Sequence, residues 1–205
     1  MTFSLPVPPD RPLRADARRN YDALLAAARD AFAALGSKAP LEEIARRAGV
    51  GIGTLYRNFP NRQILFDAVY VHEVEVLCAS AAGLGHLGPW EALEQWLRNF
   101  TGFITNKRAF TEEMARESPI VLACRTAIYA VGEPLLRRAQ EAGAARADVR
   151  MDDVLRLLTG IALLDFPGGS GQIGFVAGVA LDGLRYPPAL GARAQQEPGA
   201  LRDRD

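Results

Sequence analysis

The chain has 205 residues, of which 49% are hydrophobic and 23% are charged. This composition excludes wholesale disorder and allows a sizeable core in one large or two small domains. The formal net charge is +0, which excludes a wholly basic chromatin-type protein. Residues 1–70 nevertheless carry 10 basic and 7 acidic side chains, a positive excess that is compatible with a surface that meets polyanions.

Two cysteines, Cys78 and Cys124, are too few and too far apart for a disulfide framework or a structural zinc site. The first residues lack a positively charged segment before an apolar run, and no apolar run of about 18 residues is free of charges and helix breakers. We therefore expect a cytoplasmic protein without membrane association.

Four prolines in residues 1–13 predict a flexible arm, and residues 187–205 are predicted to form a disordered tail. Between these ends, apolar residues recur at every third or fourth position with almost no two-residue alternation, which predicts an all-α fold. About nine helices are expected, over residues 16–35, 41–48, 52–59, 61–82, 90–106, 109–117, 120–142, 151–163 and 171–184. Asn61 is the expected N-cap of the long fourth helix. Residues 14–68 are expected to form a helix-turn-helix domain, and residues 69–186 a second domain.

Residues 41–69 have the spacing of a helix-turn-helix. Such a unit needs a small residue where its two helices cross and a turn residue that tolerates positive φ four positions later. Ala45 and Gly49 stand in those two places. The second helix of the unit carries hydroxyl, guanidinium and amide groups of the kind that bind phosphates and base edges: Thr54, Tyr56, Arg57 and Asn58. By spacing alone, the alternative is an ordinary α-hairpin whose glycine caps a helix.

The segment IARRAGVGIGTLYRNFPNRQILF, with ARRNYDALLAAARDAFAALG before it, resembles the DNA-binding domain of the TetR family of bacterial repressors. The resemblance covers roughly residues 16–68, and the GTLY-x-x-F core is its most specific part. It implies that Thr54 and Tyr56 make phosphate and groove-edge contacts and that Asn58 stands at a phosphate-binding position. It also implies a phosphate contact by Arg62 at the start of the fourth helix, where the helix dipole favours an anion.

Two positions depart from the family pattern. Gly51 replaces the usual serine cap, and Ile52 is an apolar residue at a base-reading position, where it could contact a thymine methyl group. Gly53 completes the predicted DNA-binding segment. Three arginines lie where the arm meets the first helix, namely Arg14, Arg18 and Arg19. They suit a minor groove or phosphates, and the alternative is a solvated helix start.

Residues 83–186 lack the patterns that indicate catalysis. No Cys or carboxylate pair lies at ligand spacing around His72 or His86, and there is no Gly-rich phosphate loop or G-x-S-x-G elbow. Adjacent Asp152 and Asp153 face different sides of a helix, which favours a helix-terminus charge effect over a metal pair. We expect neither an enzyme nor a metal or cofactor.

Helical spacing in the second domain places Trp96, Phe100 and Phe103 on one face. One interpretation is a plain hydrophobic core. The other is a cavity for an apolar small-molecule effector, lined by these three residues and Tyr129. The family resemblance implies that the C-terminal helices enclose such a pocket and that the last two helices build a dimeric four-helix bundle.

The last two predicted helices are apolar over most of their circumference and rich in small residues, so they are either deeply buried or a subunit interface. The candidate interface residues are Leu158, Ile161, Phe175, Gly178 and Leu181. The favoured hypothesis is a homodimeric repressor that binds a double-stranded DNA operator and is released by an effector. The alternative is a helical small-molecule-binding or interaction protein that does not bind an operator.

Overall fold

A computed structural model of the chain describes residues 12, 14–36, 38–107 and 118–185. These residues form eight α-helices and one 3-10 turn and contain no strand, which confirms the predicted all-α class. The elements are α1 (Ala15–Leu35), α2 (Leu41–Arg47), α3 (Ile52–Asn58), α4 (Arg62–Ser80), η1 (Ala81–Leu84), α5 (Pro89–Lys107), α6 (Pro119–Glu141), α7 (Met151–Leu163) and α8 (Gly169–Arg185). The predicted helix over 109–117, the tail, and the arm apart from Pro12 lie outside the described residues.

Local chemistry explains where the first helices begin and end. Gly36 ends α1 with a φ of 77°, and its N–H donates to the carbonyl oxygen of Phe32. Asn61 caps α4 as predicted, because its side-chain oxygen accepts from the N–H of Ile64 at 2.9 Å. Ser118 caps α6 in the same way through the N–H of Val121.

The first hydrophobic core is formed by buried residues of α1, α2, α3 and the first half of α4. Two aromatic pairs tie these helices together: the ring centroids of Tyr21 and Phe59 lie 4.9 Å apart, and those of Phe32 and Phe66 lie 5.6 Å apart. Leu55, the buried residue of α3, is 0% exposed and anchors that short helix to this core. Such burial holds α3 in place despite its length of 7 residues.

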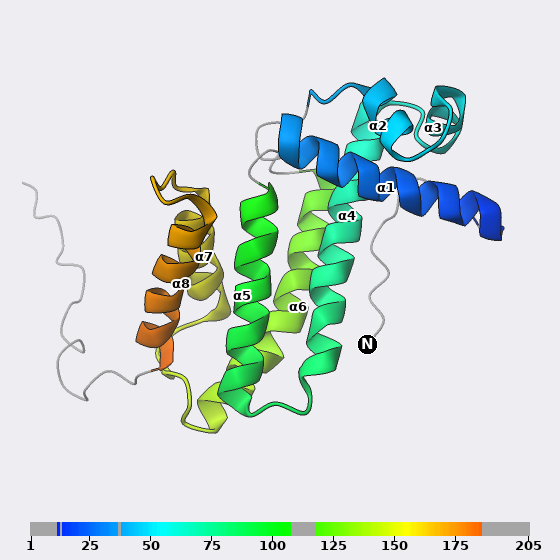
Figure 1. Ribbon diagram of the computed structural model, residues 1–205. Helices are drawn as coiled ribbons and strands as arrows, with labels where there is room; N and C mark the ends of the chain where they lie inside the picture. The colour runs from blue at the N-terminus through cyan, green and yellow to red at the C-terminus, as the bar shows by residue number, and fades with distance from the viewer. Residues whose placement is uncertain (1–11, 13, 37, 108–117, 186–205) are drawn as a thin grey trace, which may run out of the picture.

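The second core begins within the same α4 helix. Its buried residues run from Tyr70 to Leu184, whereas those of the first core end at Val69. Helix α5 is central, because it packs against α4, α6, α7 and α8. In Figure 1, α4, α5 and α6 run side by side, α1 crosses α4, and α7 and α8 lie on the other side of α5.

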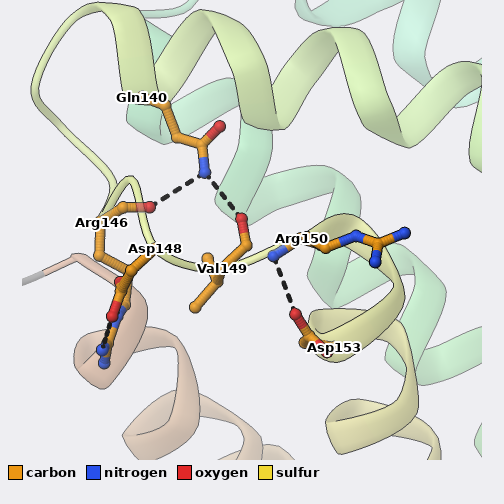
Figure 2. A network of polar contacts seen from close by, with 6 residues as sticks. All are labelled: Gln140, Arg146, Asp148, Val149, Arg150 and Asp153. Carbon is orange, nitrogen blue, oxygen red and sulfur yellow. Dashed lines mark hydrogen bonds and ion pairs between the residues drawn. The ribbon is translucent and has the colours of Figure 1, made fainter. Parts of the chain in front are cut away.

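The connection between α6 and α7 is held by a network of polar contacts (Figure 2). The side-chain amide of Gln140 donates to the carbonyl oxygens of Arg146 and Val149, both at 3.0 Å. The N–H of Arg150 then donates to the carboxylate of Asp153 at the start of α7. These bonds satisfy backbone groups that the turn would otherwise leave without partners.

Candidate nucleic-acid interface and effector domain

The turn between α2 and α3 has the geometry of a helix-turn-helix. Gly49 has a φ of 68°, a left-handed conformation that L side chains rarely adopt. The N–H of Val50 donates to the carbonyl oxygen of Ala45 at 3.0 Å, and Ala45 is 2% exposed where the helices meet. A small residue there lets α2 and α3 approach closely, while the buried Leu55 packs beneath the turn.

Helix α3 presents one face to solvent. Gly51, Ile52, Gly53, Tyr56 and Arg57 are exposed, with Ile52 at 38% and Tyr56 at 46%. These side chains therefore lie on an outer surface where DNA could reach them, although the contacts themselves stay a prediction. Tyr56 and Ile52 together give this face an apolar character beside its polar groups.

Several polar groups of α3 already have partners within the helix. The Arg57 guanidinium donates to the Thr54 hydroxyl at 2.9 Å and to the Gly53 carbonyl oxygen at 3.2 Å. The Asn58 side chain donates to the carbonyl oxygen of Thr54 at 2.8 Å, and both Thr54 and Asn58 are half-buried. Arg57 would have to leave these acceptors to reach a phosphate or a base.

Arg62 occupies a different environment from the one the sequence suggests. It is half-buried at the start of α4, and its Nη1 donates to the carbonyl oxygen of Ala39 at 2.6 Å. This bond joins α4 to the connection that precedes α2. Arg62 therefore has a structural role, and a phosphate contact would have to coexist with it.

The arginines at the start of α1 are exposed. Arg14 and Arg18 face solvent, and Arg19 forms an ion pair with Asp16 one turn away. An exposed pair of this kind contributes little to stability, so Arg19 can exchange its partner for a phosphate at small cost.

Two further arginines lie on α2, to which the sequence interpretation gave no DNA contact. Arg46 and Arg47 both bind the carboxylate of Glu43, at 2.7 Å each. Hydrogen bonds from Arg46 and Arg47 lower the pKa of Glu43 to about 2, so this carboxylate stays ionised at neutral pH. The cluster places two guanidinium groups next to α3, although Glu42 makes the helix neutral as a whole, and the EEIARR pattern could have indicated it.

The predicted effector residues separate into two places. Trp96, Phe100 and Phe103 follow one another along α5, with ring centroids 6.3 Å apart at each step. Tyr70 of α4, which the sequence did not single out, extends this row by packing on Phe103 at 6.1 Å. Trp96, Phe100 and Phe103 are all buried, so they form part of the domain core.

Tyr129 lies outside that row of rings. Its hydroxyl donates to the carboxylate of Asp152, which also pairs with Arg156. Burial and the bond to Asp152 raise the pKa of Tyr129 to about 12. Together with Arg125 and Glu133, Tyr129 lines an open hollow on the surface of α6. Tyr129 therefore faces an open hollow whose rim carries charged groups, and none of the ring contacts described for the α5 row includes it.

Three of the predicted interface residues are buried within the chain itself. Leu158, Ile161 and Leu181 are 1%, 9% and 2% exposed because α7 and α8 pack them against α5 and each other. The chain itself covers most of their surface, and their place in a subunit interface stays a prediction. Phe175 is 72% exposed, and Gly178 is half-buried with its missing Cβ 3.9 Å from an Arg98 nitrogen.

Other apolar residues of α7 and α8 do face solvent. Leu157 is 53% exposed on α7, and Phe175 and Val179, one turn apart on α8, are 72% and 56% exposed. Leu164, just after α7, is 57% exposed. Three such residues on two adjacent helices, with Leu164 beside them, mark this face as a candidate interaction surface.

Helix α6 is long and apolar enough to pass a length and composition test for a membrane span. It packs against α4, α5 and α7, and it carries Arg125 and Glu133 on its surface. A core helix of a soluble protein passes the same test, so this feature is weak evidence for a membrane. In the part of the chain that the structure describes, no three His, Cys, Asp or Glu residues are placed to hold a metal ion.

Family models match both parts of the chain. Residues 24–69 match the model of bacterial regulatory proteins of the tetR family, and residues 88–186 match the model described as the C-terminal domain of SbtR-like transcriptional regulators. The crystal structure of a TetR transcriptional regulator from Streptomyces coelicolor is 41% identical, with a TM-score of 0.70, over 82% of this chain and 99% of that one. The chain belongs to the TetR family of bacterial transcriptional regulators.

Further solved structures agree with this assignment. A TetR transcription regulatory protein from Mycobacterium vanbaalenii is 35% identical with a TM-score of 0.62, and it covers 85% of this chain and 100% of that one. A ketosteroid transcriptional regulator from Mycobacterium tuberculosis is 21% identical with a TM-score of 0.57, over 84% and 97% of the two chains, and shows the shared fold alone. The predicted family resemblance is confirmed, and this TetR-family chain is a DNA-binding regulator of transcription by fold and by family.

Proposed function

We propose that this chain is a homodimeric repressor that binds a palindromic operator through α3 and is released by a small-molecule effector in its second domain. The observation that carries the proposal is the exposed face of α3 on an intact helix-turn-helix, in a chain of the TetR family. Members of this family bind DNA and small molecules, act as dimers and are generally not enzymes. A regulator of this kind works in the cytoplasm, where DNA is accessible.

The charge and the exposure of side chains on the first helices support the proposed DNA contacts. Exposed side chains lie on the first three helices of the first core, namely Arg18 on α1, Arg46 on α2, and Tyr56 and Arg57 on α3. Side chains of these types bind phosphates and release counterions, so affinity should fall steeply with salt. Sequence preference would come chiefly from Ile52 and Tyr56, exposed side chains on the outer face of α3.

A dimer is argued from the exposed apolar residues of α7 and α8. One α3 helix covers one half-site, so a two-fold pair is needed for a useful specificity. Leu157 borders an apolar hollow of about 230 Å³ between α7 and α8, lined also by Ala180 and Leu184. Burying Leu157 and Phe175 against a second copy would remove a surface that is costly in water.

Helix α4 belongs to both cores and can therefore transmit the binding of an effector to the DNA-binding helices. Leu65 and Val69 of α4 are buried in the first core, and Tyr70 and Val74 are buried in the second. A ligand that shifts the rings around Tyr70 would tilt α4 and change the distance between the two α3 helices of a dimer. Such a ligand must bind the released state more tightly, because equal affinity for both states shifts nothing.

Electrophoretic mobility shift with the DNA upstream of its own gene tests the proposal. Wild type should retard this DNA, and the slope of log K against log salt should become shallower by about one for Arg57→Ala. Arg137→Ala is the matched control, because Arg137 is exposed on α6 and pairs only weakly with Glu141 at 3.9 Å. A wild-type protein that never retards the DNA would favour the alternative, a helical small-molecule-binding or interaction protein without an operator.

A further inference from the structure

Trp96 carries a hydrogen-bond donor that no part of the described chain accepts. The side chain is 0% exposed at the middle of α5, and its Nε1 has no hydrogen-bond partner. An indole N–H can only donate, and buried donors in folded proteins are nearly always paired. Trp90, on the same helix, shows the usual arrangement: its Nε1 donates to a Glu94 carboxylate oxygen at 2.9 Å.

The indole ring of Trp96 is fixed at its other end. A Cβ at Gly132 of α6 would lie 2.8 Å from both Cη2 and Cζ3 of Trp96 and 3.1 Å from Cε of Met151. The outer edge of the six-membered ring therefore packs directly on the α6 backbone. Because Nε1 belongs to the opposite end of the indole, the donor is held away from this contact and in one orientation.

The aromatic row that carries the donor lies in a part of the described core that holds no buried charged side chain. The ring of Phe100 stacks on Trp96 with an interplanar angle of 23°, and Phe103 continues the row. Two buried hydroxyls lie in this region: that of Thr101 donates to the carbonyl oxygen of Leu97 at 2.9 Å, and that of Tyr70 belongs to the ring that packs on Phe103. No buried cation is present in the described core to neutralise a carboxylate or a phosphate, and an unpaired charge there would be expensive.

We infer that the effector of this domain is a neutral, ring-containing molecule with an acceptor oxygen, such as a ketone or an ester, held by the Nε1–H of Trp96. This inference rests on the proposed function, since it names the ligand class of the effector site. The aromatic row supplies the apolar contact, and the unpaired N–H of Trp96 supplies the preference for oxygen. A hydrocarbon of the same shape would leave the donor unpaired, whereas an anion would lack a counter-charge.

The test uses the full chain without DNA and three probes of one shape: acetophenone, ethylbenzene and benzoate. The two tryptophan indole N–H signals are observed by nitrogen-15 NMR and assigned with Trp90→Phe. Acetophenone should move the Trp96 signal downfield and bind about tenfold more tightly than ethylbenzene, because one neutral hydrogen bond in a dry site has that effect. Benzoate should not bind detectably.

Trp96→Phe should abolish the preference of acetophenone over ethylbenzene. Trp90→Phe is the matched control and should keep the preference, because the N–H of Trp90 already has an acceptor. If Trp96→Phe does not fold, the wild-type Trp96 signal still decides the question through its response to the two neutral probes.

The inference is overturned if acetophenone leaves the Trp96 signal in place, or if its preference survives Trp96→Phe. Failure of all three probes to bind would overturn it as well. These outcomes are separate from the proposed function, which is judged by DNA retardation. A chain that retards its operator but ignores the ketone would refute this inference alone, and a chain that prefers the ketone but never retards DNA would refute the repressor alone.

Discussion

The contact between Gly132 and Trp96 predicts that two glycine-to-alanine changes will have opposite effects. A Cβ at Gly132 would lie 2.8 Å from two carbons of a ring that is 0% exposed, well inside an ordinary carbon contact of about 3.5–4.0 Å. A Cβ at Gly102 of α5 would meet nothing within 4 Å. Both positions are inside helices, so both gain about 1 kcal/mol of helix propensity from alanine.

The difference between the two variants isolates the steric contact. Overpacking a well-ordered core costs about 1–3 kcal/mol, so Gly132→Ala should be less stable than Gly102→Ala by that amount. Gly102→Ala should itself be slightly more stable than wild type. Urea denaturation followed by circular dichroism measures both, at one protein concentration because the stability of a dimer depends on it.

A double variant sharpens the interpretation. Phenylalanine lacks the outer ring atoms that meet the new Cβ, so Trp96→Phe should recover most of the stability that Gly132→Ala loses. A favourable coupling energy in this double-mutant cycle would show that the two residues act on each other directly. Equal stability of Gly132→Ala and Gly102→Ala would refute the reasoning, since it would mean that the ring does not lie against the α6 backbone.

Three further changes have defined outcomes. Phe175→Glu should give monomers in light scattering. Val76→Glu is the control and should leave the dimer intact, because Val76 is a 54% exposed apolar residue on α4. A dimer that survives Phe175→Glu would place the interface elsewhere. Burial raises the pKa of the Cys78 thiol from 9.0 to about 11. Iodoacetamide should therefore modify Cys78 at pH 8 roughly a hundredfold more slowly than a free thiol, and the rate should rise up to pH 11. A fast reaction at pH 8 would contradict this burial. Gln140→Leu should lose about 1–3 kcal/mol in urea denaturation, because two carbonyl oxygens of the α6–α7 connection lose their donor, and an unchanged midpoint would mean that water replaces it.

The sequence predicts those features of the fold that depend on neighbouring residues. The positive φ of Gly49, the cap by Asn61 and the end of α1 at Gly36 all arise within one turn of helix, so residue type and spacing are enough to place them. Helical periodicity likewise identifies the buried stripes of the first core, such as Leu55 in α3. The helix-turn-helix was predictable for this reason, since its geometry is local.

Contacts between distant segments were not predictable in the same way. Arg62 donates to a carbonyl oxygen 23 residues earlier, and nothing in its neighbours indicates that bond. Apolar residues stand on both the exposed and the buried faces of α7 and α8, so periodicity could not distinguish Leu158, which is buried, from Leu157, which is exposed. A hydrophobic pattern indicates which residues are buried. It does not indicate whether the chain itself or a partner subunit buries them.

Trp96 combines both kinds of information. Its spacing with Phe100 and Phe103 is a local pattern, and from it the sequence identifies an aromatic face without deciding between a plain core and a ligand site. The close approach of Gly132 and the missing acceptor at Nε1 come from the packing of α5 against α6. A plain core would place an aliphatic or phenyl group there at no polar cost. The buried donor that the described chain leaves without a partner is therefore the observation on which the inferred ligand site rests.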